Sequence, residues 1–420
     1  MQYLYLYPMF AFLLTAMLIV LLRPLAVNVG LVDVPNARKS HTGQIPLIGG
    51  VAIFLSVAFT LLIHTRIIPP SAYGMQQIIT YFAAATVIIL IGIWDDRKDL
   101  SAYYRFGAQI VAALIMCFGA DVILYDLGRI GFSGEPVILP KFIAIPFTVF
   151  AVLGIINAVN MCDGLDGLSG SLSLVSLLGF GIATVMWGGY NPFINVMAAA
   201  VAGFLLFNMR TVWRQKAWVF LGDAGSMLLG LTLSWLAISM SQGDIRVITP
   251  PAALWFLMVP IFDAVSMMTR RILHGRSPFQ ADKEHLHHIF LLAGFSVGET
   301  VAIMAGFAVA GVVVGLGGMY LGISDFWMAA AFTVCGLLYF WMIMRAWRVM
   351  TFLRRSICRR APSSHPDFRH SERRQNSDPD YAGPERRCGE DRRHARYEYR
   401  REGEPPVNPH ADQEPEKTPS

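Results

Sequence analysis

Residues 160–170 combine side chains that can do chemistry with a backbone that can bend. The stretch holds Asn160, Asp163 and Asp166 among glycines, and an apolar run long enough to cross a bilayer lies on either side. Glycine lets the backbone turn sharply and lets a ligand approach closely. Carboxylates at a membrane boundary are costly to desolvate, so they usually serve an ion or a substrate. The pattern predicts a loop that holds a nucleotide at the cytoplasmic face of a membrane.

The spacing of the two acids in this stretch leaves two kinds of ligand open. Asp163 and Asp166 would share one side of the segment if it were helical, because they are three residues apart. Hard carboxylate oxygens suit Mg²⁺, which commonly binds through one or two carboxylates and the phosphates of a substrate. Alternatively, the same carboxylates could accept hydrogen bonds from the edge of a base.

Two further motifs place acids at the ends of apolar runs. Asp95 and Asp96 are adjacent, and like charges this close either raise one pKa or recruit a divalent cation. As simple helix-end charges they would be badly placed, because acids in a last turn oppose the helix macrodipole. Asp223 is framed by glycines at the start of another run, where free N–H groups suit a phosphate, and Phe220 could stack on a base. The alternative for Asp223 is an ordinary N-capping role.

Three histidines within four residues mark the motif that is richest in side chains. Histidine can bind a metal, donate to phosphate or act as an acid or base. A zinc site is the competing interpretation, but His-x-His-His lacks the HExxH spacing and no cysteine lies near. Neighbouring cations favour contact with a pyrophosphate instead. The candidate residues here are Asp263, Arg276, Lys283, His285, His287 and His288.

A fifth polar segment, residues 33–50, follows the first apolar run. Its Lys39 and His41, together with Arg38, suit a phosphate-bearing ligand, since arginine offers a bidentate fork and lysine a point charge. The alternative is an ordinary basic loop on the inner side of a membrane.

The composition indicates what must position these motifs. Of 420 residues, 55% are hydrophobic and only 15% are charged, whereas a soluble protein carries about a quarter charged residues. We therefore expect an all-α polytopic membrane protein, with the five cysteines as free thiols and the first span retained rather than cleaved. The sequence suggests eleven transmembrane spans, near 4–22, 47–63, 76–94, 104–119, 141–157, 168–187, 192–208, 224–240, 251–268, 298–321 and 326–346.

The distribution of Lys and Arg gives an expected orientation. Most of these residues in the short loops fall on one side, which predicts a periplasmic N-terminus and a cytoplasmic C-terminus. All five polar motifs then lie on the cytoplasmic side, which favours a phosphoryl-transfer site beside the lipid headgroups. A membrane transporter is the rival from another class, although its acids would normally lie near the midplane.

The chain divides in composition near residue 346. Residues 347–420 are rich in arginine pairs and poor in aliphatic side chains, so they cannot bury a core and are expected to be disordered. The sequence thus predicts a transmembrane catalytic domain over 1–346 and a basic tail over 347–420. The tail would aid orientation, or would bind anionic lipid or a partner.

Taken in order, these motifs resemble the polyprenyl-phosphate N-acetylhexosamine-1-phosphate transferases of glycosyltransferase family 4. The resemblance covers residues 1 to about 346. The runs Asp33-Val34-Pro35-Asn36-Ala37-Arg38-Lys39-Ser40-His41 and Asp282-Lys283-Glu284-His285-Leu286-His287-His288 resemble the branch that uses UDP-GlcNAc. The branch that transfers phospho-MurNAc-pentapeptide typically has three consecutive histidines at the second run.

The resemblance implies a reaction and its setting. UDP-GlcNAc and undecaprenyl phosphate would give GlcNAc-diphosphoundecaprenol and UMP with Mg²⁺ or Mn²⁺, as the first membrane step of a surface polysaccharide. It implies a bacterial inner-membrane enzyme that acts at the cytoplasmic face, contacts membrane lipid, binds no nucleic acid and can form a homodimer. The same reaction with another UDP-N-acetylhexosamine, or transfer of phospho-MurNAc-pentapeptide, remains an alternative.

The resemblance also implies residue roles. Asp95 would be the base that deprotonates the lipid phosphate, Asp96 would assist at the metal or the substrate phosphate, and Asp223 would be the main metal ligand. The remaining residues would bind substrate. The uridine would be held by Asn160, Asp163 and Asp166, with Phe220 stacked on uracil. The pyrophosphate and sugar would be contacted by Arg276, Lys283, His285, His287 and His288, and further parts of the substrate by Lys39, His41 and Asp263.

Overall fold

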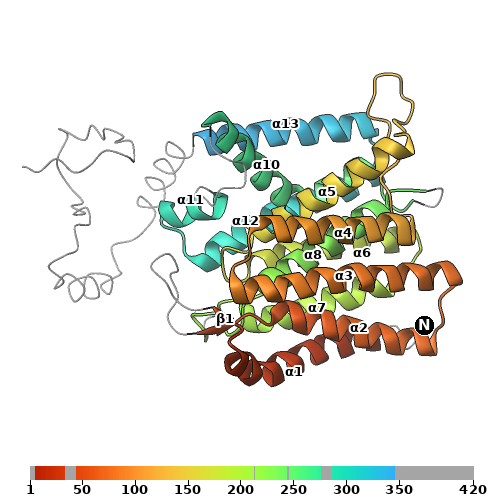
Figure 1. Cartoon of the computed structure of the whole chain (residues 1–420). Coiled ribbons are helices and arrows are strands. Elements are labelled where there is room, and N and C mark those ends of the chain that lie inside the picture. Colours follow the sequence, from red (N-terminus) through yellow and green to blue (C-terminus); the bar gives the residue numbers. More distant parts are fainter. Residues whose placement is uncertain (1–4, 34–43, 212, 244–245, 276–284, 346–420) are drawn as a thin grey trace, which may run out of the picture. The chain divides into compact units, whose positions relative to one another are not determined.

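The computed structural model describes residues 5–33, 44–211, 213–243, 246–275 and 285–345. These residues are mostly helical (Figure 1). The helices are α1 (Leu6–Val29), α2 (Gly49–Ile67), α3 (Ala72–Lys98), α4 (Ala102–Ala120), α5 (Lys141–Met161), α6 (Leu168–Met186), α7 (Pro192–Asn208), α8 (Gly222–Ser239), α9 (Pro250–Phe256), α10 (Met258–Leu273), α11 (Leu286–Ala293), α12 (Val297–Tyr320) and α13 (Asp325–Met344). Strands β1 (Val32–Asp33) and β2 (Ile45–Pro46) pair in antiparallel fashion.

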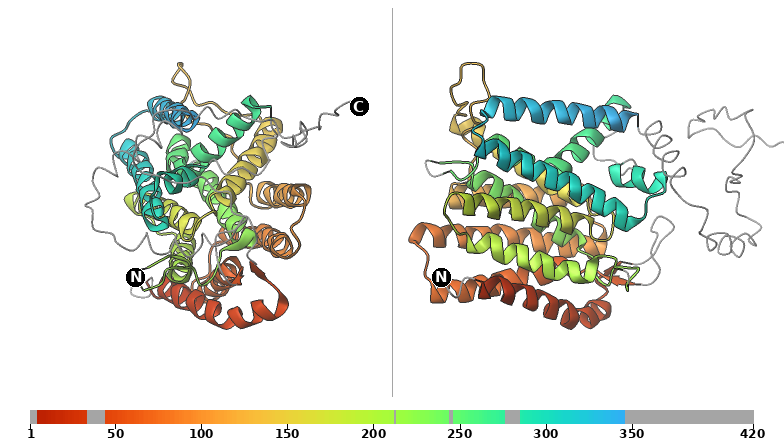
Figure 2. Two further views of the ribbon diagram at one scale, coloured as in Figure 1. Left: turned by 90° about the vertical axis from the view of Figure 1, so that its left-hand side faces the viewer. Right: turned by 180° about the vertical axis from the view of Figure 1, so that it is seen from behind.

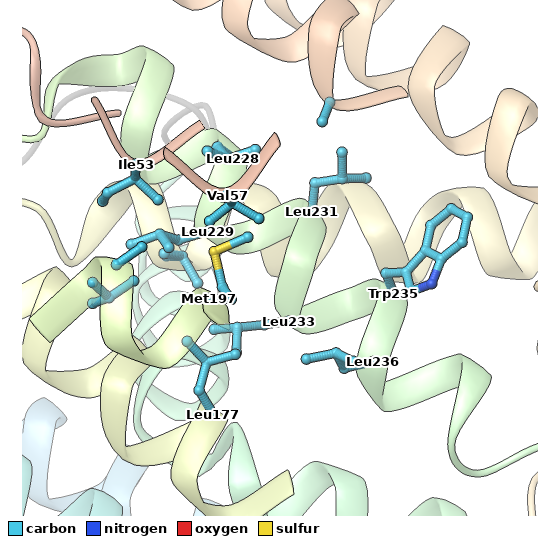
Figure 3. Close-up of a cluster of buried hydrophobic side chains, with 14 of the residues drawn as sticks. Ile53, Val57, Leu177, Met197, Leu228, Leu229, Leu231, Leu233, Trp235 and Leu236 are labelled. Atoms are coloured by element: carbon cyan, nitrogen blue, oxygen red, sulfur yellow. The ribbon is translucent and has the colours of Figure 1, made fainter. Parts of the chain in front are cut away.

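Helix α8 lies at the centre of the bundle and packs against α2, α3, α5 and α6. Every α8 residue is buried except Asp223 in the first turn and Ser239 at the end. A helix that is apolar on all sides belongs in a core. Leu228, Leu229 and Leu233 of α8 meet side chains from α2, α6 and α7 in one apolar cluster (Figure 3). Because α8 is so enclosed, the residues at its N-terminus occupy a fixed place.

Glycines allow three helix backbones to touch near that N-terminus. A Cβ atom on Gly50 of α2 would lie 2.2 Å from the Cα of Gly225, and one on Gly92 of α3 would lie 2.2 Å from the Cα of Ala224. Small residues at helix interfaces of membrane proteins permit this kind of close approach. Gly92 is one turn before Asp95 and Asp96, so the contact brings the end of α3 beside the start of α8.

The length and hydropathy of the helices confirm a polytopic all-α membrane protein. Eight described helices are long and apolar enough to cross a membrane, or nine if α9 and α10 count as one broken span. These two helices meet at an angle of 82°, where the sequence predicts one continuous span over 251–268. Helices α7 and α8 match expected spans but are not among the eight, and the short α11 had no expected counterpart. The count of eleven spans stays a prediction.

The described parts of the motif-bearing segments lie at one end of the bundle. Strands β1 and β2 and helix α11 mark this end in Figure 1, and the left view of Figure 2 looks onto it. The long connection between α4 and α5 lies at the other end, where Asp126 and Ile138 form an antiparallel bridge. The residues that a site could use therefore come from chain segments that are distant in sequence.

Candidate active site

Asp96 caps the N-terminus of α8 from a neighbouring helix. Its Oδ1 accepts a hydrogen bond from the backbone N–H of Asp223 at 2.8 Å, and its Oδ2 accepts one from Ala224 at 3.3 Å. A carboxylate is stabilised there because the first N–H groups of a helix lack partners within the helix. Gly222 has a φ of 75°, and a Cβ there would lie 2.6 Å from Oδ2 of Asp96. Only glycine fits this junction.

Asn160 holds Asp223 from the opposite side. Its Nδ2 donates to Oδ1 of Asp223 at 2.6 Å and to the Ser226 hydroxyl at 2.8 Å. Asn160 is in the last turn of α5, and Ser226 is one turn along α8 from Asp223. The end of α5 and the start of α8 thus orient one carboxylate between them.

Asp95 is buried, with 4% of its surface exposed. Its Oδ1 accepts a hydrogen bond from the backbone N–H of Leu100 at 2.8 Å, where the chain leaves α3. Its Oδ2 forms an ion pair with Nη1 of Arg105 in α4 at 3.1 Å, and this oxygen has no hydrogen-bond partner among the described residues. One oxygen is thus held by the backbone and the other by the charge of Arg105, so the carboxylate has a fixed orientation.

Several carboxylates crowd around Asp223. Asp95, Asp96 and Asp163 all lie within electrostatic range of it. Burial, followed by the charge of Asp223, raises the pKa of Asp163 to about 8. Repulsion of this kind is what a bound divalent cation would relieve.

The donor chemistry of this acid cluster fits magnesium. The described residues hold no group of three or more His, Cys, Asp or Glu side chains already arranged around one metal position. Mg²⁺ does not require such a cage, because it usually binds through one or two carboxylates and completes its shell with water and substrate phosphate. The crowded oxygens of Asp96, Asp163 and Asp223 meet that requirement.

Asp166 has a different surrounding from Asp163. Its Oδ2 accepts from Nε of Arg210 at 2.7 Å and from the backbone N–H of Ala217 at 3.3 Å. The next residue, Gly167, donates its N–H to Oδ1 of Asn208 at 2.7 Å. These bonds anchor the loop that follows α5 to the connection between α7 and α8. A uridine contact for Asp166 stays a prediction.

A second cluster forms around Asp263. Its Oδ2 lies 2.8 Å from Nδ1 of His285, while its Oδ1 accepts from the N–H of Leu286 at 3.1 Å and from the hydroxyl of Tyr339 at 2.9 Å. Asp263 is in α10, and Leu286 is the first residue of α11. The carboxylate therefore both caps α11 and fixes the ring of His285.

His287 and Gly164 join the two clusters. His287 is 1% exposed, and neither of its ring nitrogens has a hydrogen-bond partner among the described residues. Burial, then the neighbouring His288, lowers the pKa of His287 to about 3, so the ring is neutral. A Cβ on Gly164 would lie 2.5 Å from its Nε2. The loop that carries Asp163 thus reaches the histidine helix directly.

The positions of the predicted site residues follow from these contacts. Asp95, Asp96, Asn160, Asp163 and Asp223 lie together, and Asp263, His285, His287 and His288 form the adjoining cluster. Phe220 pairs through its backbone with Pro46 and Gly49, beside β2. Lys39, His41, Arg276 and Lys283 lie outside the described residues.

Sequence reasoning missed three side chains that contact these acids. Ser226 is three residues after Asp223, so helical spacing could have suggested it. Tyr339 carries a hydroxyl within an apolar span, which was a usable signal. Arg105 is ten residues after Asp95, and only the fold brings its guanidinium to that carboxylate.

Comparison with known proteins identifies the family of this chain. A model described as "Glycosyl transferase family 4" matches residues 78–241. The undecaprenyl-phosphate alpha-N-acetylglucosaminyl 1-phosphate transferase of Escherichia coli strain K12 is 36% identical over 349 residues, which cover 82% of this chain and 92% of that protein. Proteins of the same name from Yersinia pestis and Pasteurella multocida are also 36% identical over 349 residues and are covered to 93% and 94%. Since the likeness spans most of each chain, this protein belongs to glycosyl transferase family 4.

Proposed function

We propose that this enzyme transfers GlcNAc 1-phosphate from UDP-GlcNAc to undecaprenyl phosphate and releases UMP. The observation that carries the proposal is the likeness, over 82% of this chain, to transferases named for that reaction. The acid cluster at the end of apolar helices supports it, because an isoprenoid acceptor would keep its chain in lipid and present its phosphate at that boundary.

The acid cluster divides into two roles under this proposal. Asp96 and Asp223 would hold Mg²⁺ or Mn²⁺, with Asn160 keeping Asp223 oriented. When bound, the metal would neutralise charge that develops on the diphosphate. Asp95 would take the proton from the acceptor phosphate, and its ion pair with Arg105 keeps it fixed in place.

The histidine cluster would receive the rest of the donor. His285 is held through Nδ1 by Asp263, so its Nε2 is the atom left for a phosphate oxygen or a sugar hydroxyl. His288 lies beside His287, with ring centroids 4.3 Å apart. Asp163 and Gly164 come between this cluster and the acids, so a diphosphate that spans the two would pass this loop.

The setting is also part of the proposal. We place the enzyme in a bacterial inner membrane with both clusters at the cytoplasmic face, where UDP-GlcNAc is made available. The excess of Lys and Arg in the loops at this end supports that orientation. A homodimer stays a prediction, since the exposed apolar side chains of α13, such as Leu337 and Trp341, are those of a lipid-facing span.

The decisive assay uses the purified full chain. Incubated with UDP-GlcNAc, undecaprenyl phosphate and Mg²⁺, it should release UMP and form a lipid-linked GlcNAc diphosphate in equal amounts. A panel containing UDP-GalNAc and UDP-MurNAc-pentapeptide in place of UDP-GlcNAc tests the donor. Lipid product with another donor and none with UDP-GlcNAc would refute the sugar assignment, and substrate movement across vesicles without UMP would favour a transporter.

A further inference from the structure

A groove outside both clusters lies where α1 meets the connection between α7 and α8. Two adjoining hollows, of about 460 and 420 Å³, share Arg23 and Trp218 as lining residues. The first is completed by polar and cationic residues, including Arg214 and Lys216. The second is completed by Val20, Pro24, Val27 and Asn28 of α1. The groove is therefore cationic at one end and largely apolar at the other.

At the cationic end, an arginine guanidinium and two aromatic rings pack against one another. The Arg23 guanidinium lies over the Trp218 ring at 4.4 Å, and Trp218 stacks on Phe207 with ring centroids 6.1 Å apart. The backbone N–H of Trp218 donates to the Phe207 carbonyl at 2.8 Å. Arg214 donates to the carbonyls of Leu206 and Met209 at the end of α7. These contacts hold both arginines in place before any ligand arrives.

The charge of the lining selects an anion. Three cations line the first hollow, and neither hollow is lined by a described acidic residue. Arginine binds phosphate through a planar fork, and cations at a membrane surface attract anionic lipid at about 1 kcal/mol each. Trp213 is 93% exposed beside the cations, as is typical of tryptophans at the level of the headgroups.

The apolar end selects a ligand with a hydrocarbon tail. Val20, Leu21, Leu25 and Val27 are exposed on the outward side of α1, which is long and apolar enough to span the membrane. A phosphate beside Arg23 and Arg214 would leave attached acyl chains running along this surface. A free anion would use only the polar half of the groove.

From this we propose that the groove binds an anionic phospholipid of the surrounding leaflet, with its phosphate at Arg23, Arg214 and Lys216 and its acyl chains along α1. The site is separate from the acid and histidine clusters. It is nevertheless connected to the loop that carries Asp163, because Ala217 in the same connection donates its backbone N–H to Asp166.

The test measures lipid binding rather than turnover. The purified full chain in a neutral detergent is mixed with phosphatidylglycerol or with phosphatidylcholine of the same acyl chains, and thermal unfolding and bound lipid by native mass spectrometry are recorded. Phosphatidylglycerol should raise the Tm by at least roughly 2 °C more than phosphatidylcholine. Arg23→Gln should weaken phosphatidylglycerol binding about fivefold.

A matched control distinguishes this site from general surface charge. Arg345 also lies over a tryptophan, Trp341, at 5.0 Å, but lines neither hollow. Arg345→Gln should bind phosphatidylglycerol like the parent chain. Arg23→Lys keeps the charge but loses the planar fork, so its affinity for phosphatidylglycerol should lie between those of the parent chain and Arg23→Gln. This variant replaces Arg23→Gln in the test if Arg23→Gln fails to fold.

Three outcomes would overturn the assignment. Equal stabilisation by the two phospholipids would exclude a headgroup-specific site. If inorganic phosphate at matched ionic strength raised the Tm as much as phosphatidylglycerol does, the acyl chains would have no role in binding. Displacement of phosphatidylglycerol by undecaprenyl phosphate, with loss of both in Arg23→Gln, would make the groove an acceptor site instead.

Discussion

Asn160 shows how an amide can decide what a neighbouring acid does. Its Nδ2 donates to Asp223 and to Ser226, so the carboxylate is held in one orientation at the start of α8. The sequence predicted that Asn160, Asp163 and Asp223 belong to the active site, and the family resemblance implied that Asn160 binds a uridine. In the structure its amide is engaged with Asp223, whereas the uridine contact remains a prediction.

Removing the charge of Asp95 should greatly reduce turnover while leaving nucleotide binding nearly unchanged. In Asp95→Asn the amide cannot accept a proton, so kcat should fall by about 10²–10⁴-fold. Binding of UMP or UDP-GlcNAc by calorimetry should change little. Asp99→Asn is the control, since Asp99 is an exposed acid directly after the same helix. Ordinary turnover in Asp95→Asn would show that this residue is not the base.

Removing the charge of Asp223 should change the metal requirement first. Asp223→Asn lacks a carboxylate for the cation, so the Mg²⁺ concentration for half-maximal turnover should rise at least about tenfold. Ser226→Ala removes a hydroxyl that accepts from Asn160 and donates to the backbone carbonyls of Gly222 and Asp223, but it keeps the Asp223 carboxylate. It should therefore shift the Mg²⁺ requirement far less. A Mg²⁺ titration that matches the parent chain would remove Asp223 from the metal site.

His287 should make the fold sensitive to acid. Its pKa is lowered to about 3 in the folded chain, against 6.5 for an ordinary histidine. Between pH 6.5 and pH 3 the unfolded chain therefore binds a proton at this ring and the folded chain does not. Stability is therefore complete above about pH 6.5 and declines as the pH falls towards 3, by about 1.4 kcal/mol per pH unit.

The measurement is the Tm of the full chain between pH 7 and pH 5. The parent should lose stability more steeply over this interval than His287→Asn, which has no proton to take up. His274→Asn is a suitable control, because His274 is an exposed histidine at the end of α10. Parallel curves for parent and His287→Asn would contradict a buried neutral ring.

At the scale of elements, the contact between helix backbones is what aligns the acids. Gly92 approaches Ala224 so closely that a Cβ would lie 2.2 Å from its Cα. Gly92→Ala should therefore push α3 away from α8, destabilise the fold by about 1–3 kcal/mol and lower turnover. Gly107→Ala in α4 is the control, because nothing lies within 4 Å of a Cβ there. Equal Tm and activity in both variants would argue against the contact.

The sequence predicted most elements but not the breaks between them. Apolar runs gave the long helices, because a membrane span needs about 20 apolar residues. The 82° bend at Leu257 was not predicted, since Pro260 lies within α10 and the apolar run continues through the break. Helix α11 was also missed, because its eight residues depend on a cap from Asp263 rather than on their own length.

At the scale of the whole molecule, the site depends on which ends of which helices meet. Charge bias in the loops predicted that the motifs share one side, and the described residues place them at one end of the bundle. Pairings such as Asp95 with Arg105, or Asp263 with Tyr339, could not be predicted from one sequence. They are set by the packing of α3 on α4 and of α10 on α13.

The arginine-rich segment after the last helix should be dispensable for the reaction. The residues assigned to chemistry all precede residue 346, so a chain ending there should retain the kcat of the full chain within about twofold. The measurement is UMP release by both forms in the same detergent, normalised to folded protein by size-exclusion chromatography. A loss of turnover without a loss of folded protein would give the segment a direct role.

The junction at Gly50, Gly92, Gly222 and Gly225 also limits how the enzyme could escape an inhibitor. The acid cluster is positioned partly by these main-chain contacts, and substitutions alter side chains rather than main chain. A compound that bound the acids aligned by this junction would meet few tolerated replacements at the glycines themselves, because a side chain there would keep the helices apart. Resistance would then have to arise elsewhere, in the histidine helix or in the lipid-facing approach.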